Sequence, residues 1–259
     1  MADHEERPLA VVTGGTSGIG LATAQRLARD GYDLLLTGRD RGRGEEAAAA
    51  VEESSGNRTR WLQLASDDWD SYGLLRAEIG DAKVRALVVS AAEGLQTHLL
   101  DTDRDAFERM LRVNVVAPQF LVQTLAAQMA NPSSVILISS DASLQGEQAI
   151  GAYSVTKAAL NMAGKMLALD LVSSGIRVNV VCPGDTLPGM RYLVRPGHAE
   201  RPFDDYEAWV PPPRGRIGVG EDTANLIAWL VSEEADFMVG SVVLVDGGSR
   251  AGRPDPEAG

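Results

Sequence analysis

The sequence has a single cysteine, Cys182, which excludes an internal disulfide and favours a reducing, cytoplasmic setting. Histidine is nearly as scarce: His4, His98 and His198 are scattered along 259 residues. One thiol and three distant imidazoles lack the spacing of an ordinary zinc or transition-metal site. We therefore expect a chemistry that needs no bound metal.

Long apolar runs and excess positive charge are also missing. No segment approaches the ~18 apolar residues of a membrane-spanning helix, and the polar start MADHEERP lacks the apolar stretch of a signal peptide. Basic residues number 24 against 36 acidic ones, a net charge of −12 at pH 7 that repels nucleic acid and anionic membranes. Because 44% of the residues are apolar, we expect a soluble protein with a sizeable core that binds neither.

Short β-branched runs alternate with helical patterns along the chain. Two runs, Ala86–Val89 and Val135–Ile138, are apolar throughout, which is typical of strands covered by helices on both faces. The predicted strands are Leu9–Thr13, Asp33–Thr37, Arg60–Leu64, Ala86–Ser90, Ser134–Ser139, Arg177–Cys182 and Ser241–Asp246. The predicted helices are Gly18–Asp30, Gly44–Glu53, Ser71–Gly80, Asp105–Met129, Tyr153–Ser174 and Asp222–Ser232. This alternation predicts an α/β fold: a doubly wound, Rossmann-type parallel sheet in three layers, forming one domain over residues 1–259.

Residues 185–220 interrupt the alternation. Their prolines, including Pro211–Pro213, exclude a long regular helix, while their aromatic residues argue against a merely solvated loop. These aromatic residues are Tyr192, Phe203, Tyr206 and Trp209. We predict an inserted lid over the substrate, with a subunit contact or a variable surface loop as the alternatives. Residues 250–259 are predicted to be a frayed tail.

A glycine-rich turn follows the first predicted strand and leads into the first predicted helix. It reads Thr13-Gly14-Gly15-Thr16-Ser17-Gly18-Ile19-Gly20. Glycines let such a turn bend sharply and approach a pyrophosphate, whose charge is stabilised at the helix N-terminus. A plain tight connection is the alternative, which the position between the first strand and the first helix disfavours. The turn therefore predicts a dinucleotide site.

The end of the second strand decides between two dinucleotides. A carboxylate there binds the adenine ribose of NAD, whereas a guanidinium binds the 2′-phosphate of NADP. Gly38 stands where the acid is usual and Arg39 follows it, so NADP(H) is favoured over NAD(H). Asp40 could bind the ribose instead, and the nearby arginines could pair with neighbouring acids, so NAD(H) stays open.

Tyr153 and Lys157 stand four residues apart near the start of a predicted helix, so both project from one face. A nearby ammonium group stabilises a phenolate and lowers the pKa of tyrosine from its ordinary value of ~10. Such a phenol can protonate a carbonyl oxygen, or deprotonate an alcohol, as hydride is transferred. Ser140, which competes with Ser139, could hold the carbonyl oxygen, and Asn114 needs a polar partner inside its helical stretch. Taken singly, Ser140 could equally be a turn residue and Asn114 a polar group at a kink.

In these motifs the chain resembles the short-chain dehydrogenase/reductase family, in its short branch. The likeness runs from Leu9 to Gly248 and includes the motifs Pro183-Gly184 and Asp246-Gly247-Gly248. It implies a parallel sheet of seven strands and, since many members are tetramers, a homo-oligomer (tetramer or dimer).

The resemblance also implies roles for single residues. Tyr153 would be the general acid/base, and Ser140 would orient the substrate carbonyl. Lys157 would bind the nicotinamide ribose and lower the pKa of Tyr153, while Asn114 would hold a water in a proton relay. The residues expected to contact the dinucleotide are Gly14, Thr16, Ser17, Gly18, Ile19, Gly20, Arg39, Asp67, Ser90, Ala91, Ala92, Tyr153, Lys157, Pro183, Gly184 and Thr186.

Three places depart from the family pattern. Ser90-Ala91-Ala92-Glu93 replaces an Asn-Asn-Ala-Gly turn after the fourth strand. The adenine-facing acid that usually ends the third strand is absent, with Asp67 two positions later. Pro188 replaces a common threonine, and Thr186 comes before it. None of these changes removes a catalytic group.

The favoured function is hydride transfer between NADP(H) and a ketone or secondary alcohol, as a ketoreductase on a small or aromatic biosynthetic intermediate. The net acidity makes an acidic carrier protein a poor partner. Arg191, Arg195 and Arg201 could bind a substrate carboxylate or merely carry surface charge. An NAD-dependent alcohol dehydrogenase of the same family and a non-catalytic dinucleotide sensor are the alternatives. The retained catalytic set argues against the sensor.

Overall fold

The computed structural model describes residues 7–188 and 211–252. They contain a seven-stranded parallel sheet of order β3-β2-β1-β4-β5-β6-β9. Its strands are β1 (Leu9–Thr13), β2 (Asp33–Gly38), β3 (Thr59–Gln63), β4 (Val84–Val89), β5 (Met129–Ile138), β6 (Ile176–Pro183) and β9 (Val242–Val245). The predicted doubly wound sheet is confirmed.

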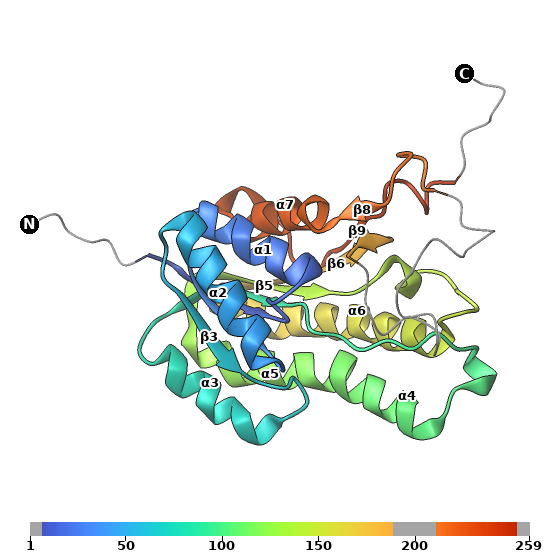
Figure 1. Cartoon of the computed structure of the whole chain (residues 1–259), viewed down its shortest axis with the longest axis horizontal. Helices are drawn as coiled ribbons and strands as arrows, with labels where there is room; N and C mark the ends of the chain where they lie inside the picture. Colours follow the sequence, from blue (N-terminus) through green and yellow to red (C-terminus); the bar gives the residue numbers. More distant parts are fainter. Residues whose placement is uncertain (1–6, 189–210, 253–259) are drawn as a thin grey trace, which may run out of the picture.

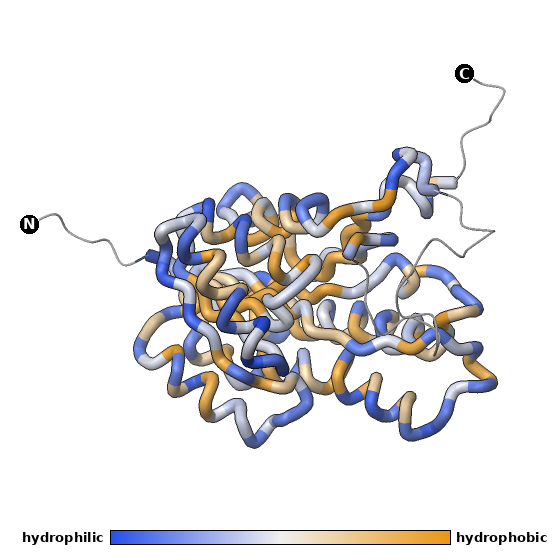
Figure 2. Tube along the Cα trace, viewed as in Figure 1, coloured by the Kyte–Doolittle hydropathy of each residue, from blue (hydrophilic) through white to orange (hydrophobic). Residues whose placement is uncertain are grey.

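Helices cover both faces of the sheet (Figure 1). On one face lie α1 (Gly18–Arg29), α2 (Arg41–Ser55) and α7 (Gly220–Val231); on the other lie α3 (Tyr72–Ile79), α5 (Ala117–Leu125) and α6 (Gly151–Leu171). Successive strand residues serve opposite faces: Leu9 and Val11 pack with the second group, Ala10 and Val12 with the first. Figure 2 shows apolar residues gathered in the middle layer. This burial on both sides explains why the central strands β1 and β4 are almost entirely apolar.

One predicted helix, Asp105–Met129, is wrong in its extent. The chain forms α4 (Arg104–Leu111), a π-helical turn over Arg112–Val116, α5, and a 3₁₀ turn over Ala126–Gln128. Met129 then begins β5 and pairs with Val84. A buried methionine fits a helical stripe and a strand equally well, so its apolar character could not mark the boundary.

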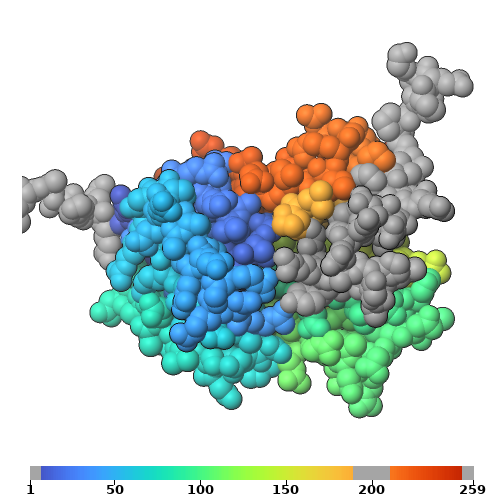
Figure 3. All heavy atoms as spheres, in the orientation of Figure 1, coloured from blue at the N-terminus to red at the C-terminus, as the bar shows by residue number. Residues whose placement is uncertain are grey.

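The sheet order reverses between β1 and β4, the neighbours at the centre of the sheet. The connections that leave the carboxyl ends of β1 and β4 run in opposite directions, which leaves a crevice between them, and ligands of open α/β sheets bind there. Helix α7 packs against α1 although the two lie far apart in the sequence, and Figure 3 shows these parts of the chain side by side on the surface. Early and late segments of the chain thus pack against each other on one face of the sheet.

The predicted lid, 185–220, is described only at its two ends. These ends form a small parallel pair, β7 (Thr186–Leu187) with β8 (Gly218–Val219). The segment 189–210, with its aromatic residues and with Arg191, Arg195 and Arg201, lies outside the described residues. The predicted tail, 250–259, is wrong at its first residue, since the Arg250 side chain is only 11% exposed and forms ion pairs.

Candidate active site

A cleft of about 390 Å³ opens at the carboxyl edge of the sheet. Its lining comes from the segments that follow β1, β2, β3, β4, β5 and β6 and from the start of α6. Of the residues predicted to contact the dinucleotide, all except Gly20 line it. Three of the four predicted catalytic residues line it as well: Ser140, Tyr153 and Lys157. The structure therefore brings the two predicted sites together in one cleft.

The glycine-rich turn forms the entrance to α1. Gly14 and Gly18 adopt positive φ angles of 65° and 52°, a conformation that favours glycine. A Cβ atom on Gly20 would collide with the backbone carbonyl of Gly14, so Gly20 shapes the turn without lining the cleft. Ser17, the N-cap of α1, lines the cleft without a side-chain capping bond. The amide end of α1 thus opens onto the cleft, as an anion site requires.

Arginines lie at the far end of the cleft, after β2. Arg39, Asp40 and Arg43 all line it. The Asp40 carboxylate accepts hydrogen bonds from the Arg43 backbone N (3.1 Å) and Nε (3.0 Å), which hold the pKa of Asp40 below its ordinary value. Asp40 is therefore the N-cap of α2, while Arg41 pairs with Glu45 at 3.8 Å and does not line the cleft. Asp67, beyond the end of β3, lines this region as expected.

The unusual turn after β4 is held by its backbone. The Thr13 hydroxyl oxygen accepts hydrogen bonds from the backbone N of Ser90 (3.2 Å) and of Ala91 (3.4 Å). Ala91 packs so close to Gly14 that a Cβ there would lie 2.9 Å from the Ala91 nitrogen. These contacts need no asparagine side chain. The departure from the family pattern therefore leaves this wall of the cleft intact.

Ser140, Tyr153 and Lys157 gather where β5 meets α6, and all three are buried. Lys157 donates from Nζ to the Ile138 carbonyl at 2.8 Å, and Nζ lies 5.6 Å from the centre of the Tyr153 ring. Ser139 donates from Oγ to the Lys157 carbonyl at 3.0 Å, which ties α6 to the end of β5. Although Ser139 also lines the cleft, its hydroxyl is thus used in this tie. The Ser140 hydroxyl makes a longer hydrogen bond, to Asp141 Oδ1 at 3.3 Å, and it also lies within hydrogen-bonding reach of Tyr153, so Ser140 remains the candidate that orients a carbonyl.

The pKa of Tyr153 is raised, whereas the sequence predicted that Lys157 would lower it. Burial raises the pKa of Tyr153 above its ordinary value, a hydrogen bond with Ser140 opposes the rise, and the charges of Asp141 and Glu147 add to it. Burial also lowers the pKa of Lys157 to about 8. Lys157 therefore does not produce a net lowering of the Tyr153 pKa in these surroundings, because burial disfavours both the Tyr153 phenolate and the Lys157 ammonium.

Asn114 forms hydrogen bonds with polar partners, as expected, but it does not line the cleft. Its Oδ1 accepts from the Glu93 backbone N (2.8 Å), and its Nδ2 donates to the Glu93 carbonyl (2.7 Å) and to Thr156 Oγ1 (3.0 Å). Thr156 in turn donates to the Tyr153 carbonyl at 2.8 Å. The fully buried amide thus joins the segment after β4 to the second turn of α6. Its observed place is structural, and the predicted water relay stays a prediction.

Sequence reasoning missed an ionic network at the catalytic end. Asp141, Glu147 and Asp185 line the cleft, and Arg250 reaches two of them. Burial raises the pKa of Asp141 to about 6, although the Arg250 charge opposes the rise. These residues belong to no motif, and their separation in the sequence hides the pairing.

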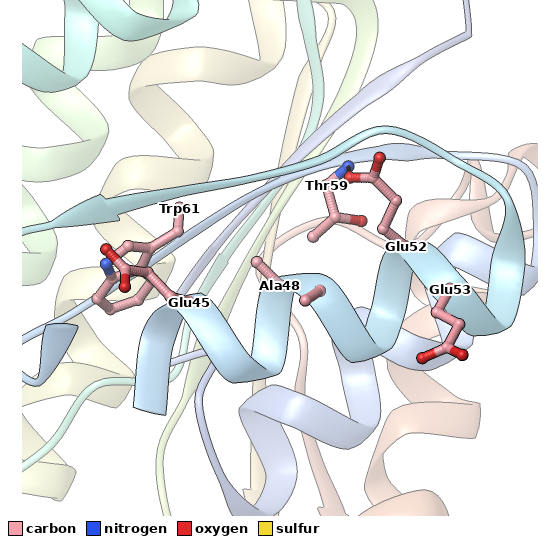
Figure 4. Close-up of a pocket in the computed structure, with 7 residues that line it drawn as sticks. Glu45, Ala48, Glu52, Glu53, Thr59 and Trp61 are labelled. Carbon is pink, nitrogen blue, oxygen red and sulfur yellow. Dashed lines mark hydrogen bonds between the residues drawn. The ribbon is translucent and has the colours of Figure 1, made fainter. Parts of the chain in front are cut away.

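A second hollow, of about 580 Å³, lies between α2 and β3 (Figure 4). Its labelled residues are Glu45, Ala48, Glu52, Glu53, Thr59 and Trp61. Three carboxylates would repel the phosphates of a dinucleotide, and one of them, Glu52, accepts a hydrogen bond from the Thr59 backbone N at 3.0 Å. None of the predicted catalytic residues lines it. The reaction therefore belongs to the cleft at the sheet edge.

Neither 7–188 nor 211–252 contains a group of three or more histidine, cysteine, aspartate or glutamate side chains placed to hold a metal ion. Within the same ranges, every helix is too short or too polar to cross a membrane.

Comparison with known proteins agrees with this geometry. The family model described as Enoyl-(Acyl carrier protein) reductase matches residues 14–250. The chain is 29% identical to the NADP-dependent (R)-specific alcohol dehydrogenase of Lentilactobacillus kefiri, over 97% of this chain and 100% of that protein. It is 31% identical to the cis-4-hydroxycyclohexanecarboxylate dehydrogenase of Sinomonas cyclohexanicum, over 94% of this chain and 96% of that protein.

Among solved structures, L-sorbose reductase from Gluconobacter frateurii, complexed with NADPH and L-sorbose, superimposes with a TM-score of 0.82. It is 26% identical and covers 94% of this chain and 97% of its own. The chain therefore belongs to the short-chain dehydrogenase/reductase family, whose members are oxidoreductases that bind a nicotinamide dinucleotide.

Proposed function

We propose that this protein transfers hydride between NADP(H) and a small ketone or secondary alcohol. The observation that carries the proposal is one cleft with a dinucleotide-type turn and arginines at one end and Ser140, Tyr153 and Lys157 at the other. The bound nicotinamide would supply or accept the hydride. The residues present fit such a group, because Gly14 and Gly18 leave room for phosphates beside the amide end of α1.

Each catalytic side chain then has a task at a stated atom. In reduction, the Tyr153 hydroxyl gives its proton to the carbonyl oxygen of the substrate; in oxidation, it takes the proton of the alcohol. Ser140 donates a hydrogen bond from Oγ to the same oxygen and so orients the substrate. Lys157, anchored on the Ile138 carbonyl, provides a cation near the phenol.

The preference for NADP(H) rests on the end of β2. Asp40, the acid that could bind a ribose, is used to cap α2 and to pair with Arg43. Arg39 lines the cleft and offers a guanidinium for the 2′-phosphate. The NADP-dependent alcohol dehydrogenase and the NADPH complex of L-sorbose reductase, both similar to this chain, favour the same cofactor. An NAD-dependent enzyme of the same family is the alternative.

A homo-oligomer is part of the same proposal. Helix α6 carries exposed apolar side chains of the kind that subunit contacts bury. These are Val155, Met162, Met166 and Leu169.

Fluorescence titration with NADPH and NADH tests the cofactor. We expect Arg39→Ala to weaken NADPH binding about 10- to 100-fold, as loss of a charge-assisted hydrogen bond should, and to leave NADH binding nearly unchanged. Arg41→Ala, outside the cleft, is the matched control and should change neither affinity. Tighter binding of NADH than of NADPH by the unaltered protein would overturn the preference.

A panel of ketones and alcohols with both cofactors, followed by nicotinamide absorbance, tests the reaction itself. Turnover of a small ketone with NADPH is the expected result. Absence of turnover with every pair, while the dinucleotide still binds, would favour the non-catalytic sensor.

A further inference from the structure

An ionic network joins three distant segments beside the catalytic residues. Arg250 Nη2 lies 3.2 Å from Asp141 Oδ2 and 2.5 Å from Glu147 Oε1. The Arg250 and Asp141 side chains are only 11% and 15% exposed. Ser140 donates from Oγ to Asp141 Oδ1 at 3.3 Å, so the network touches a catalytic hydroxyl.

The fold holds Arg250 in this place by a turn after β9. Asp246 accepts hydrogen bonds through Oδ1 from the Gly248 backbone N (3.0 Å) and through Oδ2 from the Arg250 backbone N (2.8 Å). Gly247 and Gly248 have φ angles of 62° and 91°, which let the chain reverse there. The turn thus brings the guanidinium to two of the carboxylates that line the cleft.

The geometry also fixes the charge near the phenol. Two carboxylates and one guanidinium leave one net negative charge, and loss of the guanidinium would leave two. The titratable groups that act on Tyr153 or on Asp141 come from several elements: Asp141 and Glu147 after β5, Cys182 in β6, Asp185 after β6, Lys157 in α6 and Arg250 after β9. Of these groups, only Lys157 and Arg250 are basic, and only Arg250 touches the two acids after β5.

We propose that Arg250 is a positioning residue for the reaction: it holds Asp141 and Glu147 at the substrate end of the cleft and shields the Tyr153 phenol from their charge. The role of Tyr153 as acid and base rests on the function proposed above. Because both carboxylates raise the pKa of Tyr153, a bare pair of them should make the phenolate harder to form.

The test is the pH dependence of kcat/KM for alcohol oxidation, which rises as the base form of Tyr153 appears. In Arg250→Met, which keeps length and loses charge, we expect the rise to move to higher pH by about 0.5–1 pH unit. At a fixed pH below the midpoint, oxidation should then be about three- to tenfold slower. Arg250→Lys should stay close to the unaltered protein, because it keeps the charge.

Two further variants separate electrostatics from structure. Adding Asp141→Asn to Arg250→Met removes one of the two uncompensated charges, so the rise of kcat/KM should return toward its original pH. If the loss of Arg250 merely disturbed the structure, removing this charge would not restore the profile. Glu147→Gln alone, with Arg250 present, should move the rise to lower pH, and this variant serves if Arg250→Met does not fold. Arg104→Met, which removes an exposed partner of Glu108 away from the cleft, is the control and should leave the profile unchanged.

If the rise of kcat/KM with pH stays at its original position in both Arg250→Met and Glu147→Gln, with turnover retained, Arg250 does not have the proposed role. If the unaltered protein oxidises no alcohol, the proposed function fails instead. The role of Arg250 is then decided by the ultraviolet titration of tyrosinate in the dinucleotide complex, measured against Tyr153→Phe: a Tyr153 titration that does not move in Arg250→Met refutes it.

Discussion

Tyr153 is surrounded by groups that act on its proton in opposite directions. Burial and the acids after β5 favour the neutral phenol, while Ser140 stabilises the phenolate. A neutral phenol suits the donation of a proton to a carbonyl oxygen. If Tyr153 is the acid of the proposed reaction, the protein alone therefore favours reduction, and oxidation would need further positive charge near the ring.

Replacement of Tyr153 by phenylalanine removes the proton donor and keeps the ring. We expect kcat to fall about 10²- to 10⁴-fold, the usual contribution of a positioned acid, with little change in the Kd for NADPH. Steady-state kinetics and fluorescence titration measure the two quantities. Tyr32→Phe, a change outside the cleft, is the matched control. Unaltered turnover in Tyr153→Phe would remove the acid/base assignment.

Among single residues, the sequence identified those site residues that belong to a local pattern. The glycine-rich turn and the Tyr153–Lys157 pair have spacings that place their members on one turn or one helix face. Asp141, Glu147 and Arg250 have no such spacing, because the turn after β9 brings Arg250 to the other two. Long-range pairing of this kind depends on the tertiary fold, so inspection of one sequence could not find it.

Among the helices, α7 begins with an anchored carboxylate. Asp222 accepts two hydrogen bonds from the Arg216 guanidinium, both at 2.7 Å, and one from the Val219 backbone N at 2.8 Å. Chiefly because of Arg216, the pKa of Asp222 falls to about 2. An acid whose pKa is lower in the folded protein than in the unfolded chain stabilises the fold above the unfolded value of ~3.9 and loses this effect as the pH falls.

Asp222→Asn should therefore lower the free energy of unfolding by about 0.5–1 kcal/mol at pH 7, a modest amount because the pair is largely solvated. The difference from the unaltered protein should shrink as the pH falls from about 4 toward about 2. Urea denaturation over this range measures it. Glu221→Gln, in the same helical turn but exposed, should show a smaller and flatter difference. A difference that grows in acid would contradict the assignment.

Strands and helices were predictable in kind because most strands contain a short apolar or β-branched run and the helices are amphipathic or alanine-rich. The sequence did not predict where the helices within Asp105–Met129 begin and end. The π-helical turn around Asn114 keeps helical backbone angles at both of its ends, and Pro118, which follows it, is accommodated in the first turn of α5. It exists because the buried Asn114 amide reaches Glu93 and Thr156, partners supplied by other segments.

For the whole molecule, the cleft couples ligand binding to the stability of the entire sheet. Its walls come from segments after six strands, which are together only in the folded chain. NADPH at 100 times its Kd should raise the free energy of unfolding by about 2.7 kcal/mol, because the unfolded chain does not bind it. For a chain of this size the melting temperature should rise by about 5–10 °C.

Thermal unfolding with NADPH and with NADH at equal concentration measures this effect. NADH should raise the melting temperature less, and Arg39→Ala should remove most of the difference between the two. Equal shifts in the unaltered protein would argue against a contact with the 2′-phosphate.

The cleft is more acidic at its catalytic end than after β2. After β2 and β3, Arg39 and Arg43 are balanced by Asp40 and Asp67, whereas Asp141, Glu147 and Asp185 outnumber Lys157 at the other end. Under the proposed function, an oxidised dinucleotide carries its cationic ring toward the more acidic end, so the charge difference should favour this orientation before contact is made. Added salt should weaken that preference.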